Sequence, residues 1–260
     1  MALRAQIPWD DEQPPVRALR DVPAARSEPE PLTVTFLIPA YNEAATIEEV
    51  LDRIEELPLR KQIVCIDDGS YDGTLDILKA RAEQTQNMVV LSQRNRGKGA
   101  AIRTGIPYIA GDIAVIQDAD MEYDPAEVPR LIEPIRRGVA DVVYGSRLSG
   151  GQPQRAYMFW HLVGNKFLTL TTNVLFNTTL SDMETGYKAF RAEVLSSLDL
   201  HQDSFAIEPE ITAKICKQKL RIYEMPISYY GRTYEEGKKI TWRDGFKALW
   251  VLAGARIGAL

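Results

Sequence analysis

Between residues 33 and 144, short apolar runs rich in β-branched residues alternate with longer segments in which apolar residues recur every three or four positions. The short runs predict buried strands, and the longer segments predict helices. The expected strands are 33–38, 62–66, 88–92, 113–117 and 140–144, and the expected helices are 43–57, 70–81, 97–109 and 125–137. Because strands that alternate with helices form βαβ units, we expect an α/β fold with a mainly parallel sheet flanked by helices.

After residue 145 the regular alternation ends. The expected elements there are helices at 157–176 and 207–218, strands at 185–191 and 221–228, a polar loop at 229–239, and a terminal amphipathic helix at 246–260. The loop is rich in Tyr, Arg, Lys and Gly. We therefore expect this half of the chain to extend the first half within the same domain.

Composition limits the classes of protein that the chain can represent. Residues 1–31 hold six of the 15 prolines among scattered charges and show no apolar period, which predicts a disordered tail. A net charge of −5 leaves no basic surplus for neutralising nucleic-acid phosphates, so we expect no nucleic-acid partner. Cys65 and Cys216 lie far apart in the sequence and are expected to be reduced, which suits a cytoplasmic protein.

The sequence predicts neither a secretory signal nor a membrane-spanning helix. Its N-terminus is polar and proline-rich, and no apolar run reaches the roughly 18 residues that a span requires. Trp250, Lys247 and Arg256 in the terminal helix would suit a membrane interface. A helix packed on the domain and a helix in peripheral contact with the inner face of the cytoplasmic membrane both stay open.

The apolar run 113–117 ends in Asp118 and Asp120, two carboxylates one residue apart. The carboxyl ends of strands are where open α/β sheets bind ligands. Mg²⁺ typically takes one or two protein carboxylates together with substrate phosphates. The pair therefore predicts a divalent-cation site, although an acidic turn after a strand is the alternative for such a short motif.

Ligand-competent side chains also follow the first expected strand, in the segment Pro39-Ala-Tyr41-Asn42-Glu43. A nucleotide base can stack on an aromatic ring there, and a ribose hydroxyl can meet a carboxylate. Asn42 is equally well explained as an N-cap of the next helix.

The second and third strands lead to an acidic and a basic segment, respectively. Asp67 and Asp68 precede Ser70, which could itself cap the following helix. Lys98 lies between glycines at an expected helix start, a setting that suits an anion. The spacing of a Walker phosphate loop is missing.

These four motifs, in this order and spacing, resemble glycosyltransferase family 2, whose fold is the Rossmann-like GT-A fold. The branch that they resemble contains dolichyl-phosphate mannose synthase and the bacterial polyprenyl-phosphate glycosyltransferases. The resemblance covers about residues 33–245. It implies an inverting, metal-dependent enzyme that moves a hexose from a nucleotide-diphosphate sugar to a polyprenyl phosphate. GDP-mannose, UDP-glucose and UDP-N-acetylglucosamine are the donors that it leaves open.

The resemblance also assigns parts of the chain to the donor and the acceptor. It implies a GT-A domain at 32–245, with a nucleotide-binding half at 32–145 and an acceptor half at 146–245. The residues expected to bind the nucleotide are Pro39, Tyr41, Glu43, Asp67, Asp68, Lys98 and Asp118. Asp118 and Asp120 are expected to hold Mg²⁺ or Mn²⁺.

The second half resembles the same branch at Gly145-Ser-Arg147, at Asp182-Met-Glu184-Thr-Gly, and in the basic loop that carries Arg232 and Lys238. The three cations are those that one would place around a phosphate acceptor or the donor diphosphate. Asp182, with Glu184 second, is the candidate general base if the acceptor is a hydroxyl.

Three alternatives remain at this point. Several relatives carry membrane helices after this domain, and none is predicted in this chain. A transferase that acts on a hydroxyl acceptor is therefore an alternative to one that acts on a lipid phosphate. A non-catalytic GT-A scaffold is the second alternative, and the intact acidic pairs argue against it. A nucleotidyltransferase is the third, and it would need a glycine-rich loop after the first strand.

Overall fold

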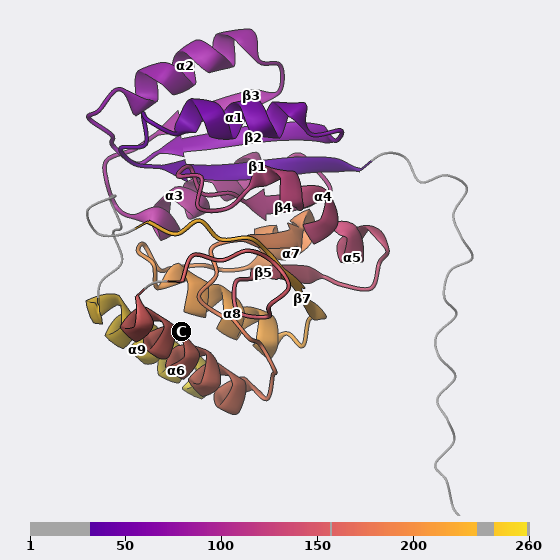
Figure 1. Ribbon diagram of the computed structural model, residues 1–260, viewed down its shortest axis with the longest axis vertical. Coiled ribbons are helices and arrows are strands. Elements are labelled where there is room, and N and C mark those ends of the chain that lie inside the picture. The colour runs from indigo at the N-terminus through magenta and orange to yellow at the C-terminus, as the bar shows by residue number, and fades with distance from the viewer. Residues whose placement is uncertain (1–31, 157, 233–241, 259–260) are drawn as a thin grey trace, which may run out of the picture. The chain divides into compact units, whose positions relative to one another are not determined.

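The computed structural model describes residues 32–156, 158–232 and 242–258. The predicted tail at 1–31 and residues 233–239 of the predicted polar loop, including Lys238, lie outside the described residues. The described chain contains a seven-stranded sheet in the order β3-β2-β1-β4-β6-β5-β7 (Figure 1). Its strands are β1 (Thr33–Ala40), β2 (Arg60–Asp67), β3 (Met88–Ser92), β4 (Ile113–Ile116), β5 (Val142–Ser146), β6 (Lys188–Arg191) and β7 (Ile222–Pro226).

The seven predicted strands are therefore present, and the predicted mainly parallel α/β sheet is confirmed. β6 is the exception, because it runs antiparallel to both β4 and β5. In its register Lys188, the first residue of β6, lies opposite Ile116, the last residue of β4. The segment that enters β6 consequently lies at the same sheet edge as the segments that leave β1, β2 and β4.

Helices cover both faces of the sheet (Figure 1). They are α1 (Ile47–Glu56), α2 (Thr74–Gln84), α3 (Lys98–Gly105), α4 (Val128–Leu131), α5 (Glu133–Arg136), α6 (Phe159–Phe176), α7 (Ala192–Ser197), α8 (Ile207–Lys217) and α9 (Trp242–Ile257). One apolar core lies between the sheet and α1, α2, α4 and α5. A second core lies on the other face, beneath α3 and α6 to α9.

The predicted single helix at 125–137 is wrong. This segment forms a short 3₁₀ turn (Pro125–Glu127) followed by α4 and α5. Pro129 and Pro134 each lack the backbone N–H that a continuous helix needs, which explains the break. The short helix α7 was not predicted.

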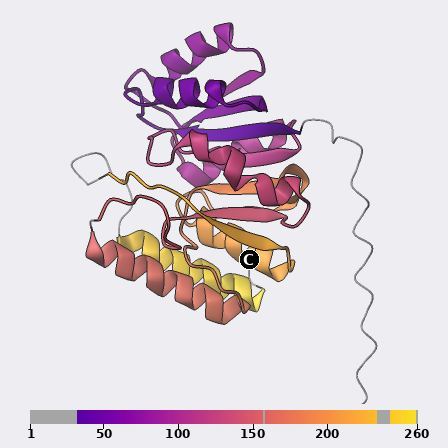
Figure 2. The same ribbon diagram turned by 45° about the vertical axis from the view of Figure 1, so that its right-hand side comes forward.

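The terminal helix differs from its predicted extent. α9 begins at Trp242 rather than at residue 246, so the predicted boundary at 245 falls inside a helix. Ala248, Leu252 and Ala255 are buried in the second core, and α9 lies against α6 and α8 (Figure 2). The helix therefore belongs to the compact unit Pro31–Leu260. No helix in the described part of the chain is both long and apolar enough to span a bilayer.

Candidate active site

A cavity of about 320 Å³ lies at the sheet edge where β1, β4 and β5 end. Most of the residues predicted for the site line it: Pro39, Tyr41, Glu43, Asp68, Lys98, Asp118, Asp120, Arg147 and Arg232. Asp67 and Asp182 do not line it, although both are buried beside it. Long-range folding thus brings together side chains from the two halves of the chain.

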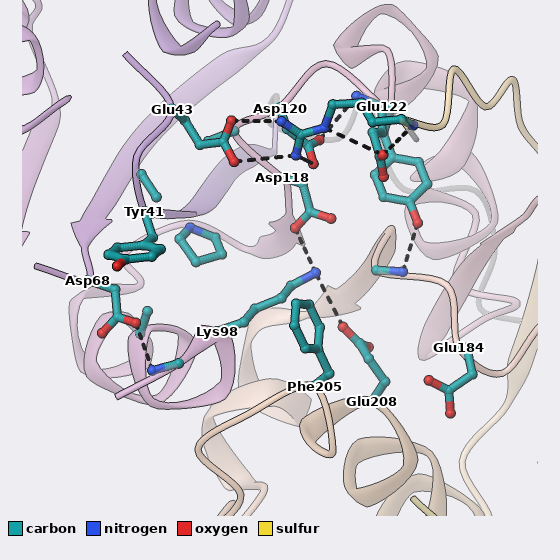
Figure 3. Close-up of a pocket in the computed structure, with 18 of the residues that line it drawn as sticks. Tyr41, Glu43, Asp68, Lys98, Asp118, Asp120, Glu122, Glu184, Phe205 and Glu208 are labelled. Carbon is teal, nitrogen blue, oxygen red and sulfur yellow. Dashed lines mark hydrogen bonds and ion pairs between the residues drawn. The ribbon is translucent and has the colours of Figure 1, made fainter. Parts of the chain in front are cut away.

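One end of the cavity is formed by Tyr41 and Asp68 (Figure 3). The Asp68 carboxylate accepts hydrogen bonds from the backbone N–H groups of Arg96 (2.9 Å) and Gly97 (2.7 Å) and from the Gln93 side chain (2.7 Å). It therefore fixes the loop that leads into α3. A carboxylate offers about four acceptor positions, so one remains for a ligand.

Gly97 must be glycine at this turn. Its φ is +107°, and a Cβ there would lie 2.5 Å from the carbonyl oxygen of Asp203. Only glycine lets the backbone before α3 approach Asp203 so closely, and this close approach positions the cation at the start of α3.

Asp67 holds a turn rather than bordering the cavity. Its carboxylate accepts from the backbone N–H of Gly69 (3.2 Å), the backbone N–H of Ser70 (3.3 Å) and the Ser92 hydroxyl (3.3 Å). The role of Asp67 is therefore to stabilise the loop that supports Asp68.

The suggested helix caps at Asn42 and Ser70 are wrong, because α1 starts at Ile47 and α2 at Thr74. Asn42 instead has a φ of +53°, and its side chain accepts from the backbone N–H of Tyr71 at 3.0 Å. The Ser70 hydroxyl accepts from the backbone N–H of Asn42 at 2.9 Å. These two bonds join the loops that follow β1 and β2.

The centre of the cavity is acidic, and two cations neutralise it. Lys98 Nζ lies 2.7 Å from Asp118 Oδ1. The Arg232 guanidinium pairs with Asp120 and lies 3.1 Å from Glu43 Oε2, and the backbone N–H of Arg232 donates to Glu122 at 2.7 Å (Figure 3). Although burial disfavours its charged form, the Asp118 carboxylate holds the pKa of Lys98 above its usual range.

The residues at this centre fit a divalent cation. Burial, followed by the neighbouring carboxylates of Asp118 and Glu122, raises the pKa of Asp120 to about 7. Such a shift marks a place where negative charge is crowded, and bound positive charge would relieve it. No cluster of three or more His, Cys, Asp or Glu side chains placed to hold a metal occurs within 32–156, 158–232 and 242–258. Asp118 and Asp120 would therefore share Mg²⁺ or Mn²⁺ with ligands from a bound diphosphate.

The opposite end of the cavity holds Glu184 and Glu208 (Figure 3). Glu208 pairs with the fully buried Lys188 and lies 3.5 Å from Lys98 Nζ. Burial and the charge of Glu208 raise the pKa of Glu184 to about 7. Gly186 lies beside the Lys98–Asp118 pair, because a Cβ there would be 2.6 Å from Lys98 Nζ and 2.9 Å from Asp118 Oδ2.

Arg147 reaches the cavity on a buried ion pair with Asp182. The Asp182 carboxylate accepts from Arg147 Nε (2.7 Å), Nη2 (2.8 Å) and the backbone N–H (3.0 Å), and from the Asn165 side chain (2.8 Å). Burial opposes the charge of Asp182, but Arg147 and Asn165 outweigh it and lower the pKa of Asp182. The geometry therefore favours Asp182 as the support of Arg147 over Asp182 as a proton acceptor.

Sequence reasoning missed several lining residues. They are Glu122, Tyr123, Phe205, Glu208 and Tyr229. Glu122 could have been found, because it follows Asp120 by two residues and its carboxylate adds to the acidic centre. Phe205 lies in a turn outside every predicted element, and Tyr229 is the first residue of the predicted loop at 229–239, so only the tertiary fold identifies both as lining residues.

Known proteins are similar to this chain in sequence. The family model described as "Glycosyl transferase family 2" matches residues 35–199. An undecaprenyl-phosphate mannosyltransferase of Micrococcus luteus is 30% identical over 257 residues, which cover 87% of this chain and 100% of that protein. A dolichol-phosphate mannosyltransferase of Pyrococcus furiosus is 28% identical, covering 80% of this chain and 59% of that protein.

Solved structures show the same fold. Glucosyl-3-phosphoglycerate synthase from Mycobacterium tuberculosis, in complex with Mn²⁺, UDP and glucosyl-3-phosphoglycerate, superposes with a TM-score of 0.65 at 22% identity. That alignment covers 87% of this chain and 80% of the synthase chain. Mannosyltransferase PcManGT from Pyrobaculum calidifontis, in complex with GDP-Man and Mn²⁺, has a TM-score of 0.54 at 20% identity and covers 89% of this chain and 75% of that chain. The predicted GT-A fold is thereby confirmed.

Proposed function

The chain belongs to glycosyl transferase family 2, and from this premise we propose that it transfers a hexose from a nucleoside-diphosphate sugar to a polyprenyl phosphate with inversion at the anomeric carbon. The single observation that carries the proposal is the cavity itself, where an acidic pair and several cations meet. The names of the Micrococcus and Pyrococcus relatives support a polyprenyl-phosphate acceptor.

In the proposed reaction, a phosphate oxygen of the acceptor attacks the anomeric carbon as the bond from that carbon to the nucleoside diphosphate breaks. Tyr41, Glu43 and Asp68 would bind the nucleoside. Asp118 and Asp120 would hold Mn²⁺ or Mg²⁺. When bound, the divalent cation would neutralise the charge that builds on the departing diphosphate. Lys98 adds a positive charge beside Asp118.

A phosphate monoester is largely dianionic near neutral pH, so it needs cations to position it rather than a general base. Arg147 and Arg232 supply positive charge at the cavity wall, and Lys238 is proposed for the same role from the sequence alone. We assign Asp182 to holding Arg147 in place, because it is fully buried and bonded to Arg147 at three positions.

Peripheral membrane contact is part of this proposal. Large apolar side chains form one exposed stripe along α6: Phe159, Trp160, Val163, Phe167, Leu170 and Val174. On the neighbouring α9, Trp250 and Ile257 are also exposed. Trp160 is 78% and Trp250 79% exposed, and aromatic side chains of this kind favour the bilayer interface.

A lipid surface fits these two helices better than a protein partner would, because exposed cations accompany the apolar stripe. Lys166 on α6 and Lys247 and Arg256 on α9 are exposed and would meet anionic headgroups. The same helix α6 contributes Asn165 to the network of Asp182, which holds Arg147 at the cavity wall. Docking through α6 would thus bring the membrane to the helix that supports this arginine.

The test is nucleotide release from GDP-mannose, UDP-glucose and UDP-N-acetylglucosamine with Mn²⁺, with and without a short polyprenyl phosphate. We expect one donor to respond and the lipid phosphate to stimulate release. Release that ignores the lipid, or that is stimulated only by a hydroxyl acceptor, would contradict the proposed acceptor.

A companion experiment measures sedimentation with vesicles that contain anionic lipid. The double variant Trp160→Ser/Trp250→Ser should lose most of the vesicle binding. Its matched control, Tyr108→Ser, replaces an exposed aromatic residue away from α6 and α9 and should bind as the wild type does. Equal binding by all three proteins would contradict docking through α6 and α9.

A further inference from the structure

We infer that the Glu184 carboxylate binds a hydroxyl group of the transferred sugar and thereby helps to select the sugar of the donor. This inference rests on the proposed function and adds to it a residue that reads the sugar. It starts from a buried acceptor atom of a cavity-lining residue, an atom that receives no hydrogen bond from the described residues.

Glu184 has no partner of its own in the described part of the chain. Its Oε1 atom is closed off from solvent and receives no hydrogen bond, although the residue lines the cavity. A buried carboxylate oxygen without a donor is costly, so such atoms usually serve a ligand or a reaction. Glu208 Oε1, across the same end of the cavity, also lacks a hydrogen bond among the described residues.

The cations that could have satisfied Glu184 are engaged elsewhere. Lys188 donates to Glu208 and to the backbone carbonyls of Met183 and Thr185. Arg147 is bound to Asp182 through both its side chain and its backbone. A ligand in the cavity can supply the donor that these cations do not.

The charge at this end of the cavity identifies the kind of ligand. Two carboxylates repel a diphosphate, which is better accommodated beside Lys98 at the centre. Tyr41 and Asp68 lie at the other end of the cavity, away from Glu184 (Figure 3). A neutral group rich in hydroxyl donors satisfies carboxylate acceptors, and in a nucleotide sugar that group is the sugar.

Glu184 is also a suitable place to discriminate among sugars. A site that hydrogen-bonds a hydroxyl rejects an analogue lacking it much more strongly than an apolar pocket could, because its buried polar atom is then left unpaired. Because the raised pKa of Glu184 keeps part of its population protonated near neutral pH, the group can accept from a hydroxyl or donate to one.

The experiment compares binding of a nucleotide sugar with binding of its nucleoside diphosphate, both with Mn²⁺, by calorimetry. Glu184→Ala should weaken binding of the donor that wild-type enzyme uses by about tenfold to a hundredfold, and leave binding of the nucleoside diphosphate unchanged. Glu184→Gln keeps one acceptor oxygen, so its affinity for the donor should lie between those of the wild type and Glu184→Ala. Asp68→Asn, at the nucleoside end, should weaken both ligands by the same factor.

Donors whose sugar lacks one hydroxyl at a time identify the contact. For one of these deoxy donors, the wild-type enzyme should lose as much affinity as Glu184→Ala loses for the full donor. The Glu184→Ala variant should bind that deoxy donor no more weakly than it binds the full donor. Equal losses for the nucleotide sugar and the nucleoside diphosphate in Glu184→Ala would overturn the inference, as would additive losses for every deoxy donor. If wild-type enzyme consumes no nucleotide sugar, the proposed function itself fails.

Discussion

The two halves of the cavity place their carboxylates in different ways. On the side of β1 and β2, Asp67 and Asp68 accept hydrogen bonds from backbone N–H groups of nearby loops. On the side of β5 and β6, Asp182 and Glu208 are held by the buried cations Arg147 and Lys188, and Glu184 by none. The first side is organised by turn chemistry, the second by charge pairing over long sequence distances.

This difference separates the tasks of the two sides. Hydrogen bonds from the backbone to Asp68 preorganise a rigid recess. Such a recess suits a nucleoside that binds in the same way in every turnover. The charge pairs of the second side leave Arg147 at the wall and Glu184 without a donor, so that side depends on its ligands for completion. Substitutions should therefore affect the two sides in different measurable quantities.

The largest effect is expected where the two sides meet, at the acidic centre. Asp120→Ala should lower the transfer rate by about 10²–10³-fold or more, because it removes a proposed ligand of the ion that would stabilise the leaving group. Chelation of divalent cations from the wild type should give a similar loss. The rate is measured as nucleotide release, and thermal unfolding checks that the fold is retained.

Asp199→Ala is the matched control for that variant, because its carboxylate is 86% exposed and lies outside the cavity lining. It should act as the wild type does. Turnover by Asp120→Ala at the wild-type rate would remove Asp120 from the proposed metal site.

A second prediction concerns how the charge pairs on the side of β5 and β6 contribute to the stability of the fold. Arg147→Ala should lower the free energy of unfolding by about 3–5 kcal/mol, since it leaves the buried Asp182 carboxylate without its cation. The double variant Arg147→Ala/Asp182→Asn removes the unpaired charge and should recover part of that loss. Urea denaturation measures both, and additive losses in the double variant would show that the two residues are not coupled.

The smallest expected effect on donor binding concerns Arg232. This residue links the acidic centre to the loop that follows β7, and it pairs with Glu43 and Asp120. Arg232→Ala should reduce transfer by about tenfold or more while changing donor affinity by about threefold at most, if the guanidinium serves the acceptor. Calorimetry with the donor and rate measurements distinguish the two effects. Matching losses in both would place Arg232 on the donor diphosphate instead.

Much of the cavity side formed by β1 and β2 was predictable from the sequence because its hydrogen bonds are local. Strand periodicity placed β1, β2 and β4, and Tyr41, Asp68 and Asp118 follow those strands directly, so the parallel sheet had to bring them to one edge. What failed there was also local. Asn42 and Ser70 have the residue types of helix caps, but their side chains join two loops.

The charge pairs of the second side could not be predicted, for a physical reason. Its partners are distant in sequence, as with Lys188 and Glu208 or Arg147 and Asp182, and no short-range pattern specifies such pairs. The antiparallel direction of β6 decides that the segment from Asp182 to Gly186 reaches the cavity. Strand direction is set by tertiary packing, and the sequence of the predicted strand at 185–191 is compatible with either direction.

The most direct test of the proposed reaction is to identify its product. Wild-type enzyme with Mn²⁺ would be given each nucleotide sugar together with undecaprenyl phosphate in vesicles, and the lipid fraction analysed by mass spectrometry. We predict a lipid whose mass equals undecaprenyl phosphate plus one anhydrohexose (or anhydro-N-acetylhexosamine) unit, formed from a single donor and absent with Asp120→Ala. An unmodified lipid fraction, with the sugar recovered only in water-soluble products, would contradict the polyprenyl-phosphate acceptor.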